Sequence, residues 1–103
     1  MTKVVVSDAA HKDLLAILGE IGVAAGEKVA VFYAAEVERF YSRLALFPES
    51  GSPRRALGVN ARIGILYPYV VVYDYLESEK TVIVLCLVHG RRRITKRLVR
   101  GFP

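Results

Sequence analysis

The spacing of hydrophobic residues changes near the middle of the chain. In the first half, apolar positions recur every three or four residues over two stretches, 7–22 and about 25–47. This period predicts two amphipathic helices, and the short link between them favours an antiparallel helical hairpin. A β-branched run at residues 3–7 precedes the helices and predicts a strand.

After a loop rich in Pro, Gly and Ser, the period becomes that of extended chain. Strands are predicted at residues 61–66, 69–75 and 81–88, and their short links make neighbouring strands antiparallel. The predicted fold is therefore α+β, in the order β-α-α-β-β-β, with a helical hairpin packed on a small antiparallel sheet. The first strand is expected at an edge of the sheet or beside the last strand. The whole chain, 1–103, is expected to form one domain.

The predicted sheet carries apolar residues on both faces. The run 81–88 is apolar at every position after Thr81, and strand 69–75 has large side chains on either side. One side holds Val70 and Val72, and the other holds Tyr69, Val71, Tyr73 and Tyr75. The two helices can cover only one face of the sheet. The basic C-terminal segment is the only other part of this polypeptide that could cover the second face. We therefore expect a bare apolar face that a second copy or a different protein covers.

Composition narrows the class of protein. A hydrophobic fraction of 53% excludes a disordered chain, and a single cysteine, Cys86, excludes an internal disulfide. Cys86 lies in an apolar run and is interpreted as a small buried residue. The sequence has no apolar stretch long enough for a membrane span or a signal peptide, so we expect a cytoplasmic protein.

Charge is distributed unevenly along the chain. The formal net charge is +5, yet residues 80–103 contain seven basic and no acidic side chains, while the rest carries eight basic and ten acidic ones. We expect the basic segment at residues 90–103 to contact an acidic partner. Ile94, Leu98 and Val99 interrupt the cations, and a short amphipathic helix would bring Ile94 and Leu98 together.

These features, taken in order, resemble the RelE/ParE superfamily of bacterial toxins, which act in toxin–antitoxin and plasmid-stabilisation systems. LALFPESGSPRRALG, at residues 44–58, is similar to the link after the second helix in the ParE branch. YPYVVVY at 67–73 and VLCLVHGRRR at 84–93 are similar to its last two strands and its terminal His-Gly-Arg motif. The resemblance covers residues 3 to about 93.

The resemblance implies a toxin that a cognate antitoxin holds inactive by occupying a groove over the sheet and helices. ParE-like members poison DNA gyrase, whereas RelE-like members cut messenger RNA on the ribosome; neither role calls for a cofactor or metal here. The residues expected to contact the antitoxin are Tyr69, Val71, Tyr73, Tyr75, Arg54 and Arg55. The residues expected to contact the target are Arg91, Arg92, Arg93, Lys96, Arg97 and Arg100.

The ribonuclease pattern of the RelE branch is incomplete in this chain. That branch has an arginine after the tyrosine that opens the third strand, where this sequence has Val70 after Tyr69. Arg91 or Arg92 could supply its second arginine, but no tyrosine occurs from residue 76 onward. His89 is the best single candidate for acid–base work, and a structural hydrogen bond is the preferred interpretation of it. We therefore expect action by binding rather than by catalysis.

Three functions remain open on the sequence alone. A gyrase-binding toxin is favoured; the alternatives are a ribonuclease that uses His89, Arg91 and Arg92, and a degenerate toxin that only binds its antitoxin in autoregulation. Direct contact with nucleic acid through the basic segment, and self-association without the antitoxin, are also open. Removal of the chain after Gly90 is expected to abolish toxicity and leave the sheet largely intact.

Overall fold

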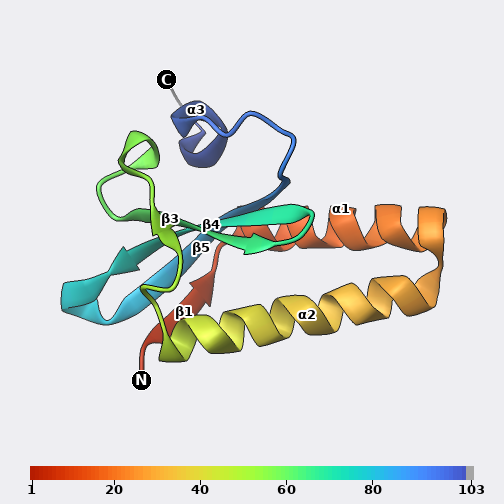
Figure 1. The fold of residues 1–103 in the computed structure, drawn as a ribbon, viewed down its shortest axis with the longest axis horizontal. Helices are drawn as coiled ribbons and strands as arrows, with labels where there is room; N and C mark the ends of the chain where they lie inside the picture. The colour runs from red at the N-terminus through yellow and green to blue at the C-terminus, as the bar shows by residue number, and fades with distance from the viewer. Residues whose placement is uncertain (102–103) are drawn as a thin grey trace.

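A five-stranded sheet organises the molecule, with a helical hairpin on one face and a short C-terminal helix on the other (Figure 1). The computed structural model describes residues 1–101. The long elements are β1 (Lys3–Val6), α1 (Asp8–Ala25), α2 (Glu27–Leu46), β3 (Ala61–Leu66), β4 (Tyr69–Leu76) and β5 (Thr81–His89). The short ones are β2 (Ser52–Pro53), the 3-10 turns η1 (Arg55–Leu57) and η2 (Glu77–Glu79), and α3 (Lys96–Arg100).

The strand order is β1-β5-β4-β3-β2, so the predicted β-α-α-β-β-β order and α+β class are confirmed. The sheet is mixed rather than wholly antiparallel, because β1 runs parallel to β5, with Lys3 opposite Thr81 and Val6 opposite Val84. A parallel neighbour requires a long crossover connection, and the helical hairpin is part of that connection. The first strand thus lies both at an edge and beside the last strand.

The hairpin follows from capping and from one glycine. Ser7 begins α1, where its side-chain oxygen accepts a hydrogen bond from the backbone N–H of Ala10 at 3.0 Å. Gly26 alone separates the two helices and has φ +98°, a conformation that favours glycine because a Cβ there would be strained. The helices then run side by side and extend past the sheet (Figure 1).

Two hydrophobic cores lie on opposite faces of the sheet. The first is between the sheet and the hairpin, and includes Ala10, Val37, Phe40, Leu44, Val71, Tyr73, Val82, Val84 and Leu87. The second, which we call the rear core, is made of Leu57, Ala61, Ile63, Val70, Val72, Cys86 and Val88. Every residue of the rear core is buried, and Ile94, Leu98 and Val99 of the C-terminal segment pack against it.

The expectation of a bare apolar sheet face was therefore wrong. The reason is that the apolar residues among the C-terminal cations fold back and cover the rear core. Ile94 and Leu98 do share one side, as expected, although only Leu98 lies within the helix. Removal of the chain after Gly90 would strip this cover, so the sheet is not expected to survive that truncation.

Candidate functional site

The C-terminal segment is fixed to the sheet by a charged contact as well as by its apolar residues. The guanidinium of Arg100 donates two hydrogen bonds to the Asp74 carboxylate of β4, at 2.7 and 2.8 Å, and a third to the Leu57 carbonyl at 2.9 Å. The hydrogen bond to Asp74 raises the pKa of Arg100 above its ordinary value. Thr95 caps α3, since its hydroxyl accepts a hydrogen bond from the Leu98 N–H at 3.2 Å.

This anchoring separates the basic residues into two groups. Arg100 was expected to contact the target, but its side chain is committed to Asp74 inside the molecule, so that assignment is corrected. The other five are exposed, and within residues 1–101 none of them forms an ion pair: Arg91, Arg92, Arg93, Lys96 and Arg97. We call these five the cationic patch. Their repulsion is not relieved internally, which favours an acidic partner.

His89 contacts the first residue of the cationic patch, Arg91. Its Nδ1 accepts a hydrogen bond from the backbone N–H of Arg91 at 3.0 Å, and its ring packs edge-on against Tyr69 with centroids 5.8 Å apart. The N–H of Gly90 bonds to the Pro68 carbonyl at 2.8 Å and ties this turn to the β3–β4 turn. The structural interpretation of His89 fits these contacts.

An open groove of about 550 Å³ lies beside His89, between α2 and the turn that joins β3 to β4. Its lining is mostly aromatic and apolar and includes one arginine: Tyr33, Ile65, Tyr67, Pro68, Tyr69, Val70, His89, Gly90 and Arg91. Ile65 and Tyr67 are 63% and 84% exposed, which is high for side chains of this size. We call this feature the aromatic groove. No sequence pattern indicated it, because α2 and the turn are distant in the chain.

The six residues expected to contact an antitoxin do not form one surface. Val71 and Tyr73 are both 0% exposed beneath the hairpin, so a partner cannot reach them, and their assignment is withdrawn. Tyr69 is half-buried at the aromatic groove, whereas Tyr75 is half-buried toward the other end of β4. Because six residues of a strand span about 20 Å, Tyr69 and Tyr75 lie far apart along β4. Arg54 and Arg55 are exposed in the loop beside β2, and their role stays a prediction.

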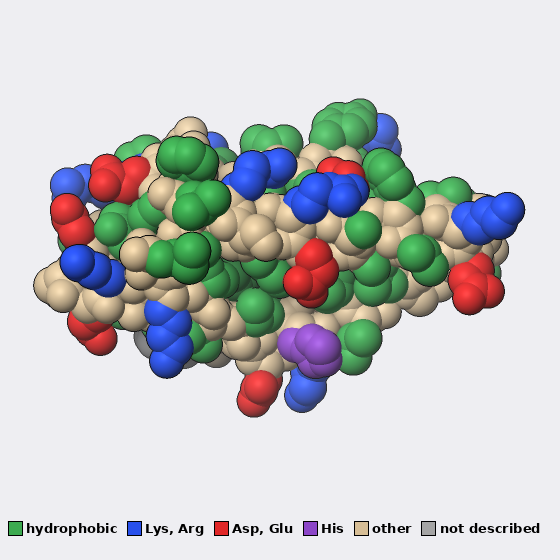
Figure 2. All heavy atoms as spheres, turned by 90° about the horizontal axis from the view of Figure 1, so that it is seen from below, with side chains coloured by type: hydrophobic (Ala, Val, Ile, Leu, Met, Phe, Trp, Pro, Cys, Tyr) green, Lys and Arg blue, Asp and Glu red, His purple; other side chains and the backbone are tan. Residues whose placement is uncertain are grey.

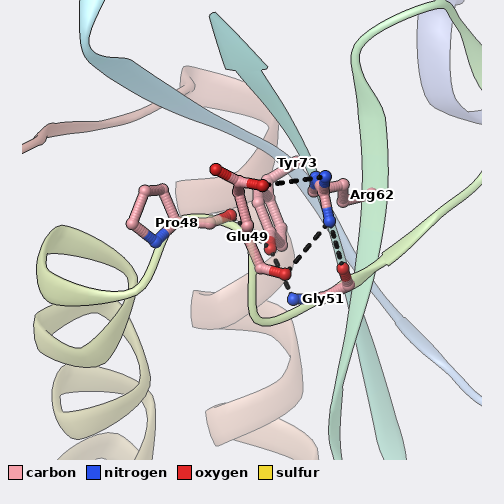
Figure 3. Close-up of polar contacts among 5 residues, drawn as sticks. All are labelled: Pro48, Glu49, Gly51, Arg62 and Tyr73. Atoms are coloured by element: carbon pink, nitrogen blue, oxygen red, sulfur yellow. Dashed lines mark hydrogen bonds and ion pairs between the residues drawn. The ribbon is translucent and has the colours of Figure 1, made fainter. Parts of the chain in front are cut away.

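Tyr73 instead holds the loop between α2 and β3 (Figure 3). Its hydroxyl donates to the Pro48 carbonyl at 2.9 Å and accepts from the Gly51 N–H at 2.8 Å. Arg62 closes the same loop by donating to the carbonyls of Glu49, at 3.0 Å, and of Gly51, at 2.7 Å. Burial is the main cause of the raised pKa of Tyr73.

Cys86 is buried within the rear core. Burial raises the pKa of Cys86 to about 11, so its thiol stays protonated and poorly nucleophilic at neutral pH. In the described part of the chain, no three His, Cys, Asp or Glu side chains are grouped so that they could hold a metal ion. No helix of residues 1–101 is both long and apolar enough to cross a membrane.

Comparisons with known proteins agree with this architecture. The family model described as the ParE toxin of the type II toxin–antitoxin system parDE matches residues 4–94. A solved structure of the chromosomal ParDE toxin–antitoxin system from P. aeruginosa is similar over 86% of this chain and 96% of its own, with a TM-score of 0.71 and 18% identity.

A second solved structure, the toxin–antitoxin complex RelBE2 from Mycobacterium tuberculosis, is similar over 85% of this chain and 96% of its own chain. Its TM-score is 0.61 and its sequence identity 21%. No curated protein matches the sequence. At these identities the two structures establish the fold, while the family model covers most of the chain.

Proposed function

This chain belongs to the ParE toxin family of type II toxin–antitoxin systems, and we propose that it inhibits DNA gyrase by binding rather than by covalent chemistry. The cationic patch carries this proposal. Five exposed cations stand on a turn and a short helix that the rear core and Arg100 hold in place. An ordered set of charges loses little conformational entropy when it meets an acidic surface. Because gyrase acts on DNA in the cytoplasm, the chain would work there too.

A cognate antitoxin is the second partner that we propose. The aromatic groove supports it, because Ile65 and Tyr67 expose apolar surface beside Tyr33 and Tyr69. Exposed apolar residues of this size in one concave site usually contact another protein. A bound antitoxin would then lie next to Arg91, at the start of the cationic patch, and could block access to it.

The experiment neutralises the cationic patch without touching its support. Replacing Arg91, Arg92, Arg93, Lys96 and Arg97 with glutamine keeps Ile94, Leu98, Val99 and Arg100, which a truncation would lose. We expect this variant to fold, as judged by circular dichroism, and to lose inhibition of gyrase supercoiling in a purified assay. A control with Lys3, Lys28, Arg39, Arg54 and Arg55 changed to glutamine loses the same charge elsewhere and should still inhibit. Equal inhibition by both variants would refute the role of the cationic patch.

A ribonuclease is the second candidate, because Tyr69, His89 and Arg91 meet at the aromatic groove. Against it, the RelE-type arginine position is held by Val70, which is 7% exposed and belongs to the rear core. Induction of the chain, followed by separate measurement of DNA synthesis and message integrity, distinguishes the two. Early message cleavage while replication continues would favour the ribonuclease. Absence of any growth effect, with antitoxin binding retained, would indicate a degenerate toxin.

A further inference from the structure

The outer half of the helical hairpin carries apolar surface that the rest of the described chain covers only in part. No residue between Ala10 and Val37 is buried, because the two helices extend past the sheet. Residues 14–35 of this overhang contain only three charged side chains. Figure 2 views the molecule from below, the side on which α2 lies in Figure 1, and shows hydrophobic side chains among charged ones. A surface of this kind usually has a partner.

The exposed side of α1 has a pattern that suits close helix packing. Leu15 and Val23 are 57% and 92% exposed, and Ala9, Ala16 and Gly19 on the same helix are exposed as well. Small residues allow two helix axes to approach to about 8 Å, the lower end of the usual range. The helix therefore offers both apolar area and room for a second helix.

The same helix is complementary in charge to an antiparallel copy of itself. Lys12 and Glu20 lie four residues to either side of Ala16, about 6 Å along the axis. Both side chains are exposed, and neither forms an ion pair within the part of the chain that the structure describes. A two-fold axis at Ala16 would bring Lys12 level with the partner's Glu20 and Glu20 level with the partner's Lys12. It would also bring Val23 level with the partner's Ala9, a large residue against a small one.

Charge along the hairpin itself does not oppose self-association, because residues 14–35 carry only one basic and two acidic groups. Arg92 of the cationic patch lines the same hollow as Ala16 and Glu20 of α1. Two hairpins side by side would make a four-helix arrangement, a common way to bury such surfaces.

We propose that the free chain forms a symmetric dimer through α1, with an antiparallel helix pair centred on Ala16 and two Lys12–Glu20 ion pairs across the axis. This proposal does not depend on gyrase being the target.

The test is the oligomeric state of the purified full chain, measured by sedimentation over a range of concentrations. We expect a dimer whose dissociation constant rises about tenfold in Lys12→Glu or Glu20→Lys, because each change replaces two attractive pairs with two repulsive ones. The combined variant, Lys12→Glu with Glu20→Lys, should restore association because it exchanges the charges. Lys80→Glu, an exposed reversal distant from α1, should leave the dimer unchanged.

A second variant tests the packing independently of charge. Ala16→Arg should give a folded monomer, since the exposed position tolerates arginine but the helix axes could no longer approach. A wild-type chain that stays monomeric at its highest soluble concentration would overturn the proposal. So would a dimer that tolerates both charge reversals and Ala16→Arg. If the free chain is monomeric and Ala16→Arg abolishes antitoxin binding, the face belongs to the antitoxin and the proposal is wrong.

Discussion

At the scale of single residues, Tyr73 shows how one hydroxyl can organise a loop. Its ring belongs to the core beneath the hairpin, and its oxygen lies between the Pro48 carbonyl and the Gly51 N–H (Figure 3). The sequence placed Tyr73 on the correct face of its strand but assigned it to a partner. Its hydrogen-bond partners are 22 and 25 residues away in the chain, and no local pattern points to them.

Tyr73→Phe should lower the free energy of unfolding by about 1–3 kcal/mol. The substitution keeps the ring but leaves the Pro48 carbonyl and the Gly51 N–H without their partner in a buried place. Urea denaturation followed by circular dichroism would measure the change. Tyr67→Phe is the matched control, because that ring is 84% exposed, and it should have no measurable effect. A Tyr73→Phe protein as stable as the wild type would show that water replaces the lost bonds.

At the scale of elements, the C-terminal segment does two things at once. Its apolar residues complete the rear core, and its cations face the solvent. The sequence showed both the apolar and the basic residues of this segment, and their spacing predicted a short amphipathic helix. It could not show that Asp74, 26 residues before Arg100, would fix the segment to the sheet, because that contact depends on the arrangement of the whole chain.

Arg100→Ala should therefore loosen α3, whereas Arg97→Ala should not. Removing the guanidinium leaves the Asp74 carboxylate, whose side chain is 13% exposed, without its charged partner, at a cost of about 1–3 kcal/mol. Arg97 belongs to the same helix but is exposed and forms no ion pair within residues 1–101. Amide hydrogen exchange of residues 96–100 in each variant would report the difference. Equal exchange in the two variants would contradict the anchoring role of Arg100.

At the scale of the whole molecule, the order of the long elements could be predicted because each has a clear period or a continuous apolar run. The parallel pairing of β1 could not, since a four-residue strand carries no signal for its direction. The cover of the second sheet face was mispredicted because the three apolar residues recognised among the cations of residues 91–100 were not expected to fold back onto the sheet. Val71 and Tyr73 were wrongly assigned to the antitoxin because β4 has no face open to solvent at its centre.

Stability should accordingly be unequal between the sheet and the hairpin. The centres of β4 and β5 have strands on both sides and a core on each face, so their amides should exchange slowest. Amides of residues 14–35, where no side chain is buried, should exchange much earlier in a dilute solution that contains only monomer. Native-state exchange followed by mass spectrometry would measure this order. Slower exchange at residues 14–35 than in β5 would contradict it.

In the C-terminal segment, the residues that pack on the sheet and the residues that carry exposed charge are different ones. This separation affects how such a chain can diversify. Substitutions on its solvent side change the charge that the molecule presents without disturbing Ile94, Leu98, Val99 or Arg100. Recognition could therefore drift from one acidic surface to another in single steps, each leaving a foldable intermediate. Selection for target recognition and selection for folding would therefore act on different residues of the same segment, 91–100.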